Sequence, residues 1–287
     1  MFTVVIKYAV YTRMRDQILE YDPSYLIYGG GTSFVINVII FRFVSPFLSR
    51  RITETYRDLP NHEQQEWNDR LISNVNSVIS VLLSGYCLLY EDGSRADVWY
   101  NSGVARTACA VIVGYMFADI LCMIFWCKMK RGEFLGYVFH HAATVYAYYF
   151  ISAYGVLCYF GMFRLIAEVS TVPVNQRWYF DITGYPRARV IVVLNGFCML
   201  ITFFIFRIVA MPLYWYQIWM VTYTEAVWRL GHIQLIMYIP CFVLDVLNIM
   251  WFYKMFKGFI KALKGIKALK GILNVSGPDS KEKLKTV

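Results

Sequence analysis

Long apolar runs are the feature that most limits what this chain can fold into. A helix needs about 20 predominantly apolar residues to cross the hydrocarbon core of a bilayer. Such runs recur along most of the 287 residues, and only 16% of the residues are charged, against about 25% in an average soluble domain. We therefore predict an all-α, polytopic membrane helical bundle with about seven spans (six to eight). The predicted spans are residues 24–48, 71–90, 104–127, 134–152, 155–174, 188–211 and 233–256.

The distribution of Lys and Arg predicts how these spans are oriented. Basic residues are frequent in connections such as 49–70 and 128–133, and scarce in 91–103. Loops rich in Lys and Arg stay in the cytosol. With seven spans, we expect the N-terminus in the lumen and the C-terminal tail in the cytosol. The segment 211–229 is rich in Trp and Tyr, which is typical of an interfacial or re-entrant helix; as an eighth span it would move the N-terminus to the cytosol.

The C-terminal region carries most of the formal net charge of +9, with nine Lys from position 254 onward. Lys recurs there at three- and four-residue spacing, which predicts a basic amphipathic helix (254–273) on an anionic cytosolic leaflet and no nucleic-acid partner. A solubilising tail made by a short duplication is the alternative. The chain ends in KLKTV, in which Lys283 and Lys285 match the dilysine signal that retrieves membrane proteins to the endoplasmic reticulum. We therefore expect a multi-pass endoplasmic reticulum protein.

Ionisable residues inside the predicted spans indicate a candidate site, because in lipid they usually pair or line a cavity. His140 and His141 are adjacent, so their side chains project about 100° apart on a helix. One can line a cavity while the other bonds a neighbouring helix, which suits a general base and its orienter; packed core histidines are the alternative. The other residues predicted for a lipid-binding polar core are Tyr115, Asp119, Arg164 and Glu168.

Helical spacing predicts two contacts within this polar core. Arg164 and Glu168 are four positions apart and are expected to pair, and Tyr115 is expected to donate to Asp119. The four histidines are too few for the di-iron centre of membrane desaturases, so no metal is expected. A single metal held by the histidine pair and an acid stays an open alternative. No cofactor motif is present, and the seven cysteines read as buried apolar residues.

An ordered set of motifs resembles the TLC-domain family, which includes the ceramide synthases. We accordingly divide the chain into an N-terminal polar segment (1–23), a first transmembrane helix and loop (24–66), a TLC domain (67–261) and a basic cytosolic tail (262–287). The matching residues, in chain order, are Trp67, Arg70 and Ser73, then Gly114, Tyr115 and Asp119, then His140 and His141, then Glu168, Ser170, Thr171, Pro173 and the run 175–178.

The resemblance implies lipid chemistry in internal membranes. In ceramide synthases the histidine pair serves acyl transfer from acyl-CoA to a sphingoid amine, which implies base and orienter roles for His140 and His141 and acyl-CoA as a co-substrate. The chain differs from those enzymes in having only Glu168 as an acid within 142–175, and Asn76 where many members have His. We favour a protein that handles acyl lipids and contributes to membrane lipid homeostasis. An acyl-CoA-dependent acyltransferase and a non-enzymatic cargo or packaging receptor are the alternatives.

Overall fold

The first half of the chain forms four long helices. The computed structural model describes residues 18–91, 97–127 and 131–275, and these residues contain helices but no strand. The first helix is continuous and includes two π-helical stretches: η1 (Tyr25–Gly30), α2 (Gly31–Ile39), η2 (Ile40–Val44) and α3 (Ser45–Ile52). A short α4 (Glu54–Asp58) leads into α5 (Asn61–Tyr90), followed by α6 (Gly103–Phe125) and α7 (Arg131–Tyr154).

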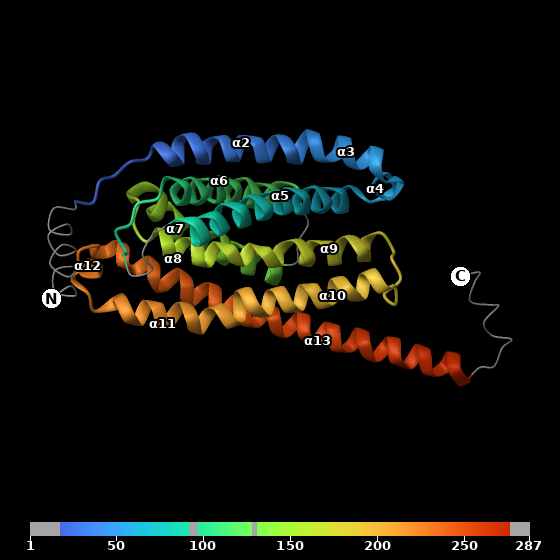
Figure 1. The fold of residues 1–287 in the computed structure, drawn as a ribbon. Helices are drawn as coiled ribbons and strands as arrows, with labels where there is room; N and C mark the ends of the chain where they lie inside the picture. Colours follow the sequence, from blue (N-terminus) through green and yellow to red (C-terminus); the bar gives the residue numbers. More distant parts are fainter. Residues whose placement is uncertain (1–17, 92–96, 128–130, 276–287) are drawn as a thin grey trace.

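The second half adds a broken rod and two long helices. The rod consists of α8 (Cys158–Leu165), the 3-10 helix η3 (Ile166–Ser170) and α9 (Thr171–Ile182). Next, α10 (Val190–Phe203), the π-helix η4 (Phe204–Val209) and α11 (Ala210–Thr222) run as one helix. Short turns, α12 (Glu225–Trp228) and η5 (Gly231–Met237), precede α13 (Ile239–Val275), which extends beyond the bundle. Figure 1 shows the long segments running back and forth side by side, which confirms the predicted all-α polytopic bundle.

Five helices of the described residues are long and apolar enough to cross a membrane: 25–52, 61–90, 103–125, 190–222 and 231–265. The other two predicted spans are present as α7 and as the rod α8–η3–α9, which lie alongside these five (Figure 1). They do not meet the same hydropathy criterion, because α7 is rich in Tyr and contains the histidine pair, and because the rod contains Arg164 and Glu168. The described residues therefore pass along the bundle seven times, as expected, although only five of these passes meet the hydropathy criterion.

Two predicted segments fold differently from expectation. Residues 155–174 were expected to form one span, but the helix tightens at η3 before α9 begins. Pro173 lies in the first turn of α9 and has no N–H with which to continue the hydrogen-bond ladder of α8. The segment 211–229 was expected to be interfacial or re-entrant. Instead, residues 210–222 extend α10 as one apolar helix, and the short turns begin only after Thr222.

Helix α6 lies at the centre of the bundle and packs against α2, α5 and α7. It is apolar on nearly all sides, which is the pattern of a helix buried by neighbours. Its closest crossing is with the first helix, where a Cβ atom on Gly114 would lie 2.0 Å from the carbonyl oxygen of Gly30. The Ser33 hydroxyl donates to the carbonyl of Val111 at 2.7 Å in the same crossing. Small residues at such contacts are how helices approach closely in lipid.

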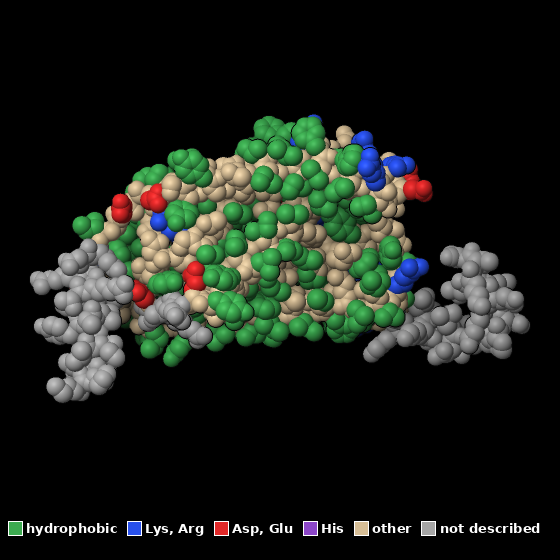
Figure 2. Space-filling view, turned by 45° about the horizontal axis from the view of Figure 1, so that its top comes forward, with side chains coloured by type: hydrophobic (Ala, Val, Ile, Leu, Met, Phe, Trp, Pro, Cys, Tyr) green, Lys and Arg blue, Asp and Glu red, His purple; other side chains and the backbone are tan. Residues whose placement is uncertain are grey.

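Charged residues gather at the two ends of the bundle, and hydrophobic side chains cover the sides between them (Figure 2). At the end where α3 and α9 finish and α13 leaves the bundle, basic residues predominate; we call this the basic end. The acidic side chains Glu20, Asp22, Glu91 and Glu225 belong to segments at the opposite, acidic end. The residues that make up the basic end are Arg50, Arg51, Arg57, Arg177, Arg187, Lys254, Lys257, Lys261 and Lys264.

The buried Arg106 of α6 stabilises the packing at the acidic end. Its guanidinium contacts the Asp22 carboxylate at 3.0 Å, donates to the carbonyl of Ser152 at 2.8 Å and lies over the ring of Tyr25. Hydrogen bonds from Ser24, together with Arg106, lower the pKa of Asp22 below its usual value. These contacts join the start of the first helix to α6 and α7.

Candidate functional site

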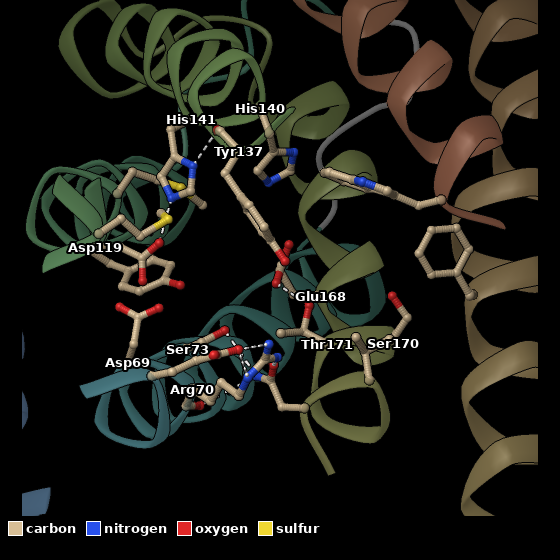
Figure 3. A pocket seen from close by; sticks show the side chains of 18 of the residues that line it. Asp69, Arg70, Ser73, Asp119, Tyr137, His140, His141, Glu168, Ser170 and Thr171 are labelled. Atoms are coloured by element: carbon tan, nitrogen blue, oxygen red, sulfur yellow. Dashed lines mark hydrogen bonds and ion pairs between the residues drawn. The ribbon is translucent and has the colours of Figure 1, made fainter. Parts of the chain in front are cut away.

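A cavity of about 280 Å³ lies among α5, α6, α7, η3, α9, η4 and α13, in the half of the bundle nearer the basic end. Its walls are mixed: Met116, Phe203 and Trp251 are apolar, whereas acids, histidines and hydroxyls form the remaining surface. Lys254, which is exposed, and the partly exposed Arg70 also line it, so the cavity reaches the basic end. Figure 3 shows the polar side chains converging on this space from several helices. We call it the histidine cavity.

His141 is buried, and hydrogen bonds hold it at both ring nitrogens. Its Nδ1 atom lies 2.7 Å from the backbone carbonyl oxygen of Tyr137, and its Nε2 atom lies 2.7 Å from Oδ2 of Asp119. A carbonyl only accepts, so Nδ1 must carry a hydrogen. A single proton then joins Nε2 to the Asp119 carboxyl group. Because both of its nitrogens are occupied, His141 is placed to orient the Asp119 carboxyl group and to balance its charge rather than to contact a ligand.

Asp69 of α5 lies beside Asp119, and Figure 3 shows the two carboxyl groups facing one another. The Oδ1 atom of Asp69 is buried and accepts no hydrogen bond from the described residues. A buried acceptor without a donor is costly. Asp69 lines the histidine cavity, so a hydroxyl, amine or water held there would satisfy this oxygen.

His140 differs from its neighbour in having an unused nitrogen. Its Nδ1 atom is buried and makes no hydrogen bond with the described residues. The ring contacts the edge of Trp251, with centroids 5.5 Å apart, and that of His141, 5.7 Å away. His140 lines the histidine cavity and also a smaller cavity of about 40 Å³ that continues deeper into the bundle. It is therefore the histidine placed to meet a ligand.

Glu168 pairs with Arg207, not with Arg164 as the spacing predicted. The Arg207 guanidinium lies 3.3 Å from Glu168 Oε1 and donates from Nε to the Ser170 hydroxyl at 2.7 Å. The Thr171 hydroxyl donates to the other carboxylate oxygen of Glu168 at 2.7 Å. The 3-10 turn η3 changes the direction of Glu168, and the π-helix η4 carries Arg207, so two irregular helical segments form this network.

Arg164 bonds across the bundle to α13 instead. Its guanidinium lies 2.6 Å from Oδ1 of Asp245, and the indole of Trp215 donates to Oδ2 at 2.8 Å. Arg164 lines the 40 Å³ cavity and a further cavity of about 30 Å³, not the histidine cavity. The predicted polar core is therefore split, with Arg164 lying deeper than the rest.

Arg70 forms part of the mouth of the histidine cavity. It pairs with Glu66 at 2.6 Å, donates to the side chain of Asn175 at 3.1 Å and lies over the Trp178 ring. Asn175 in turn donates to Asn74 at 2.8 Å, which ties α9 to α5. These bonds hold the guanidinium in place and leave its charge near the opening.

Five of the sequence-predicted residues therefore line one cavity. Tyr115 also lies there, but the Asp119 carboxylate bonds with His141 rather than with the predicted Tyr115 donor. Lys283 and Lys285 lie outside the described residues. Within the described chain, no group of three or more His, Cys, Asp or Glu is arranged to hold a metal ion. The five predicted residues are Tyr115, Asp119, His140, His141 and Glu168.

Asp69 and Arg207 complete the site but were not predicted to belong to it. The second span was predicted to begin at residue 71, which left Asp69 in a loop, whereas α5 begins at Asn61. The signal was present in the sequence: Glu66, Asp69 and Ser73 follow the i, i+3, i+7 spacing of one helix face. For Arg207 no sequence spacing indicates its partner, because the partner is on another helix.

Comparisons with known proteins identify the same region of the chain. Residues 66–257 match the TLC domain. TLC domain-containing protein 4-B of Danio rerio is 40% identical over 241 residues, covering 83% of this chain and 90% of the relative. TLC domain-containing protein 4 of Homo sapiens is 36% identical over 250 residues (86% and 94%), and TLC domain-containing protein 4 A of Dictyostelium discoideum is 23% identical over 260 (86% and 95%). No solved structure matches the chain.

Proposed function

The chain belongs to the TLC-domain family, and we propose that it is an endomembrane protein that holds an acyl lipid among its helices and so contributes to membrane lipid homeostasis. The observation that supports this most is the histidine cavity itself. The apolar part of the cavity wall suits an acyl chain, and the atoms of Asp69 and His140 that have no partner among the described residues suit a polar group attached to it. The smaller cavities beyond His140 extend this space toward Tyr148 and Tyr214.

The proposal is tested by quantitative lipidomics on cells that lack the protein and re-express it at matched levels. We expect wild type to restore a defined lipid class and His140→Ala, which leaves the His141–Asp119 pair intact, to fail although it is folded and correctly located. The double variant His62→Ala/His232→Ala is the control, because both of these histidines are exposed and neither lines the cavity. Equal rescue by His140→Ala and by this control would show that His140 is not needed for lipid handling. No lipid change with wild type would favour a cargo receptor.

A second candidate function, acyl transfer from acyl-CoA, is favoured by the open Nδ1 of His140 beside an oriented His141. In that reaction the hydroxyl or amine of a lipid attacks the thioester carbonyl, a new ester or amide bond forms and the carbon–sulfur bond breaks. His140 accepts the proton from the attacking group and returns it to the departing thiolate. Purified protein supplied with acyl-CoA and an acceptor lipid should then release free CoA thiol, and His140→Ala should abolish that release.

We further propose that the basic end faces the cytosol and that the protein resides in the endoplasmic reticulum. The first part follows from the gathering of Arg and Lys at one end of the bundle. The second part rests on Lys283 and Lys285. The variant Lys283→Ala/Lys285→Ala should leave the endoplasmic reticulum, whereas Lys267→Ala/Lys270→Ala, which removes the same charge upstream, should remain there.

A further inference from the structure

A second hollow adjoins the histidine cavity and carries an inference of its own. It has a volume of about 440 Å³ and lies among α9, α10 and α13 at the basic end. It shares Arg70, Tyr137, Val174, Lys254 and Met255 with the histidine cavity, so the two spaces adjoin at these side chains. We call it the α10–α13 groove.

One part of this groove is cationic. Arg70, Arg177, Arg187 and Lys254 line it, together with a single acid, Asp181. Asp181 pairs with Arg177 and lies 3.9 Å from Arg187, whose side chain is 71% exposed. Arg70 is already paired with Glu66, and Asp181 alone cannot balance the other three cations, so this part of the groove keeps a net positive charge. Groups that carry negative charge on several oxygens, such as phosphate esters, match it best.

The remaining wall is apolar and faces the side of the bundle. Val193, Gly196 and Met199 of α10 form one side, and Phe259 and Leu263 of α13 form the other. The two helices approach closely because Gly196 has no side chain: a Cβ atom there would lie 3.2 Å from the Phe259 ring. The groove therefore combines a charged end with an apolar wall along two helices.

We infer that the α10–α13 groove binds one anionic phospholipid of the surrounding leaflet. Its phosphate contacts Arg177, Arg187 and Lys254, and one acyl chain lies against the wall between α10 and α13. The positive charge and the apolar wall next to it together favour a membrane lipid over free phosphate, because free phosphate has no acyl chain to pack against the wall. Because the groove adjoins the histidine cavity, this inference rests on the proposed function and names the class of lipid that enters it.

The test measures lipid binding to the purified full-length chain in a neutral detergent by native mass spectrometry. The probes are palmitoyl-oleoyl phosphatidic acid, the diacylglycerol with the same chains, palmitoyl-CoA and inorganic phosphate. We expect phosphatidic acid to bind and diacylglycerol and inorganic phosphate to bind much more weakly. Arg177→Gln/Arg187→Gln should weaken phosphatidic acid binding at least about tenfold, since two charge-assisted contacts are lost. Val193→Trp, which fills the wall, should abolish binding.

The control variant is Lys257→Gln/Lys261→Gln, which removes two cations from α13 that do not line the groove. An equal loss of binding in the control would reduce the effect to general attraction by the basic end and overturn the inference. So would equal binding of diacylglycerol, or binding of palmitoyl-CoA without phosphatidic acid. None of these variants alters His140 or His141. Failure here therefore leaves the lipidomic rescue unaffected, and the two proposals are judged separately.

Discussion

At the scale of single residues, the two adjacent histidines have different surroundings. His141 uses both nitrogens within the protein, with Asp119 on one side and a backbone carbonyl on the other. The buried Nδ1 atom of His140 makes no hydrogen bond with any residue that the structure describes. Removing His141 would leave the buried Asp119 carboxylate without its partner. Removing His140 would break no such bond between helices.

We therefore predict that His141→Ala mainly lowers stability, whereas His140→Ala mainly abolishes function. His141→Ala should lower stability by about 3–5 kcal/mol, the usual cost of removing one partner of a buried pair. His140→Ala should leave thermal unfolding in detergent nearly unchanged while abolishing lipid rescue. Adding Asp119→Asn to His141→Ala should recover part of the lost stability. If His140→Ala unfolds as early as His141→Ala, the assignment of roles is wrong.

At the same scale, the histidine pair, Asp119 and Glu168 were predictable because charged and titratable residues are rare in apolar runs. Asp69 was missed because the apolar run alone underestimates the length of α5, which begins ten residues before the predicted span starts at 71. The Arg164–Glu168 pair was predicted wrongly because i,i+4 spacing applies only within a regular helix. The 3-10 turn at η3 interrupts that regularity, so Arg164 pairs with Asp245 and Glu168 pairs with Arg207, both on other helices.

At the scale of helices, the central α6 depends on one close crossing. Gly114 contacts the backbone of Gly30 so closely that even one added carbon has no room. Backbone atoms cannot swing aside as flexible side chains do, so the two helices would have to separate. The same crossing supports Tyr115 and Asp119, which follow Gly114 on α6 and line the histidine cavity.

Gly114→Ala should therefore destabilise the bundle by about 1–3 kcal/mol and lower its unfolding temperature by roughly 5 °C. Gly136→Ala on α7 is the matched control, because nothing lies within 4 Å of its added Cβ atom. That control should be neutral or slightly stabilising, since Ala is the better helix former. Fluorescence-detected thermal unfolding of both variants checks the prediction, and equal unfolding temperatures would refute the close crossing.

The number of passes was predictable from the apolar runs, because the bilayer sets their length. The ends of the segments were harder to predict. Residues 210–222 continue α10 even though Trp and Tyr interrupt their apolar character, and Pro173 helps divide a run that is apolar enough to be one helix. Composition decides whether a segment lies in the membrane, whereas local hydrogen bonding decides where its helix bends or ends.

At the scale of the whole molecule, the charge distribution is the basis of the proposed orientation, in which the basic end faces the cytosol. Basic residues gather at one end and acidic residues at the other, with apolar side chains between them (Figure 2). The histidine cavity and the α10–α13 groove both lie toward the basic end. Ligands would then enter from the cytosolic leaflet.

An epitope tag inserted after Gly184, in the exposed turn at the basic end, should be accessible when only the plasma membrane is permeabilised. A tag inserted after Gly231, in the exposed turn before α13, should become accessible only after internal membranes are opened. Both glycines are exposed, have positive φ and have nothing within 4 Å of an added Cβ atom, so both turns offer accessible insertion points. The reverse pattern of accessibility would place the basic end in the lumen.

The central claim is that the histidine cavity holds a lipid, and mass spectrometry of lipids retained by the purified protein tests it most directly. Val174 of α9 lines the cavity where it adjoins the α10–α13 groove, so a large side chain there obstructs both spaces, whereas Val172, two residues earlier, is exposed on the outside of the same helix. We predict that wild type and Val172→Trp retain about one acyl lipid per chain after detergent exchange, and that Val174→Trp retains none. Equal retention by all three proteins would contradict the account.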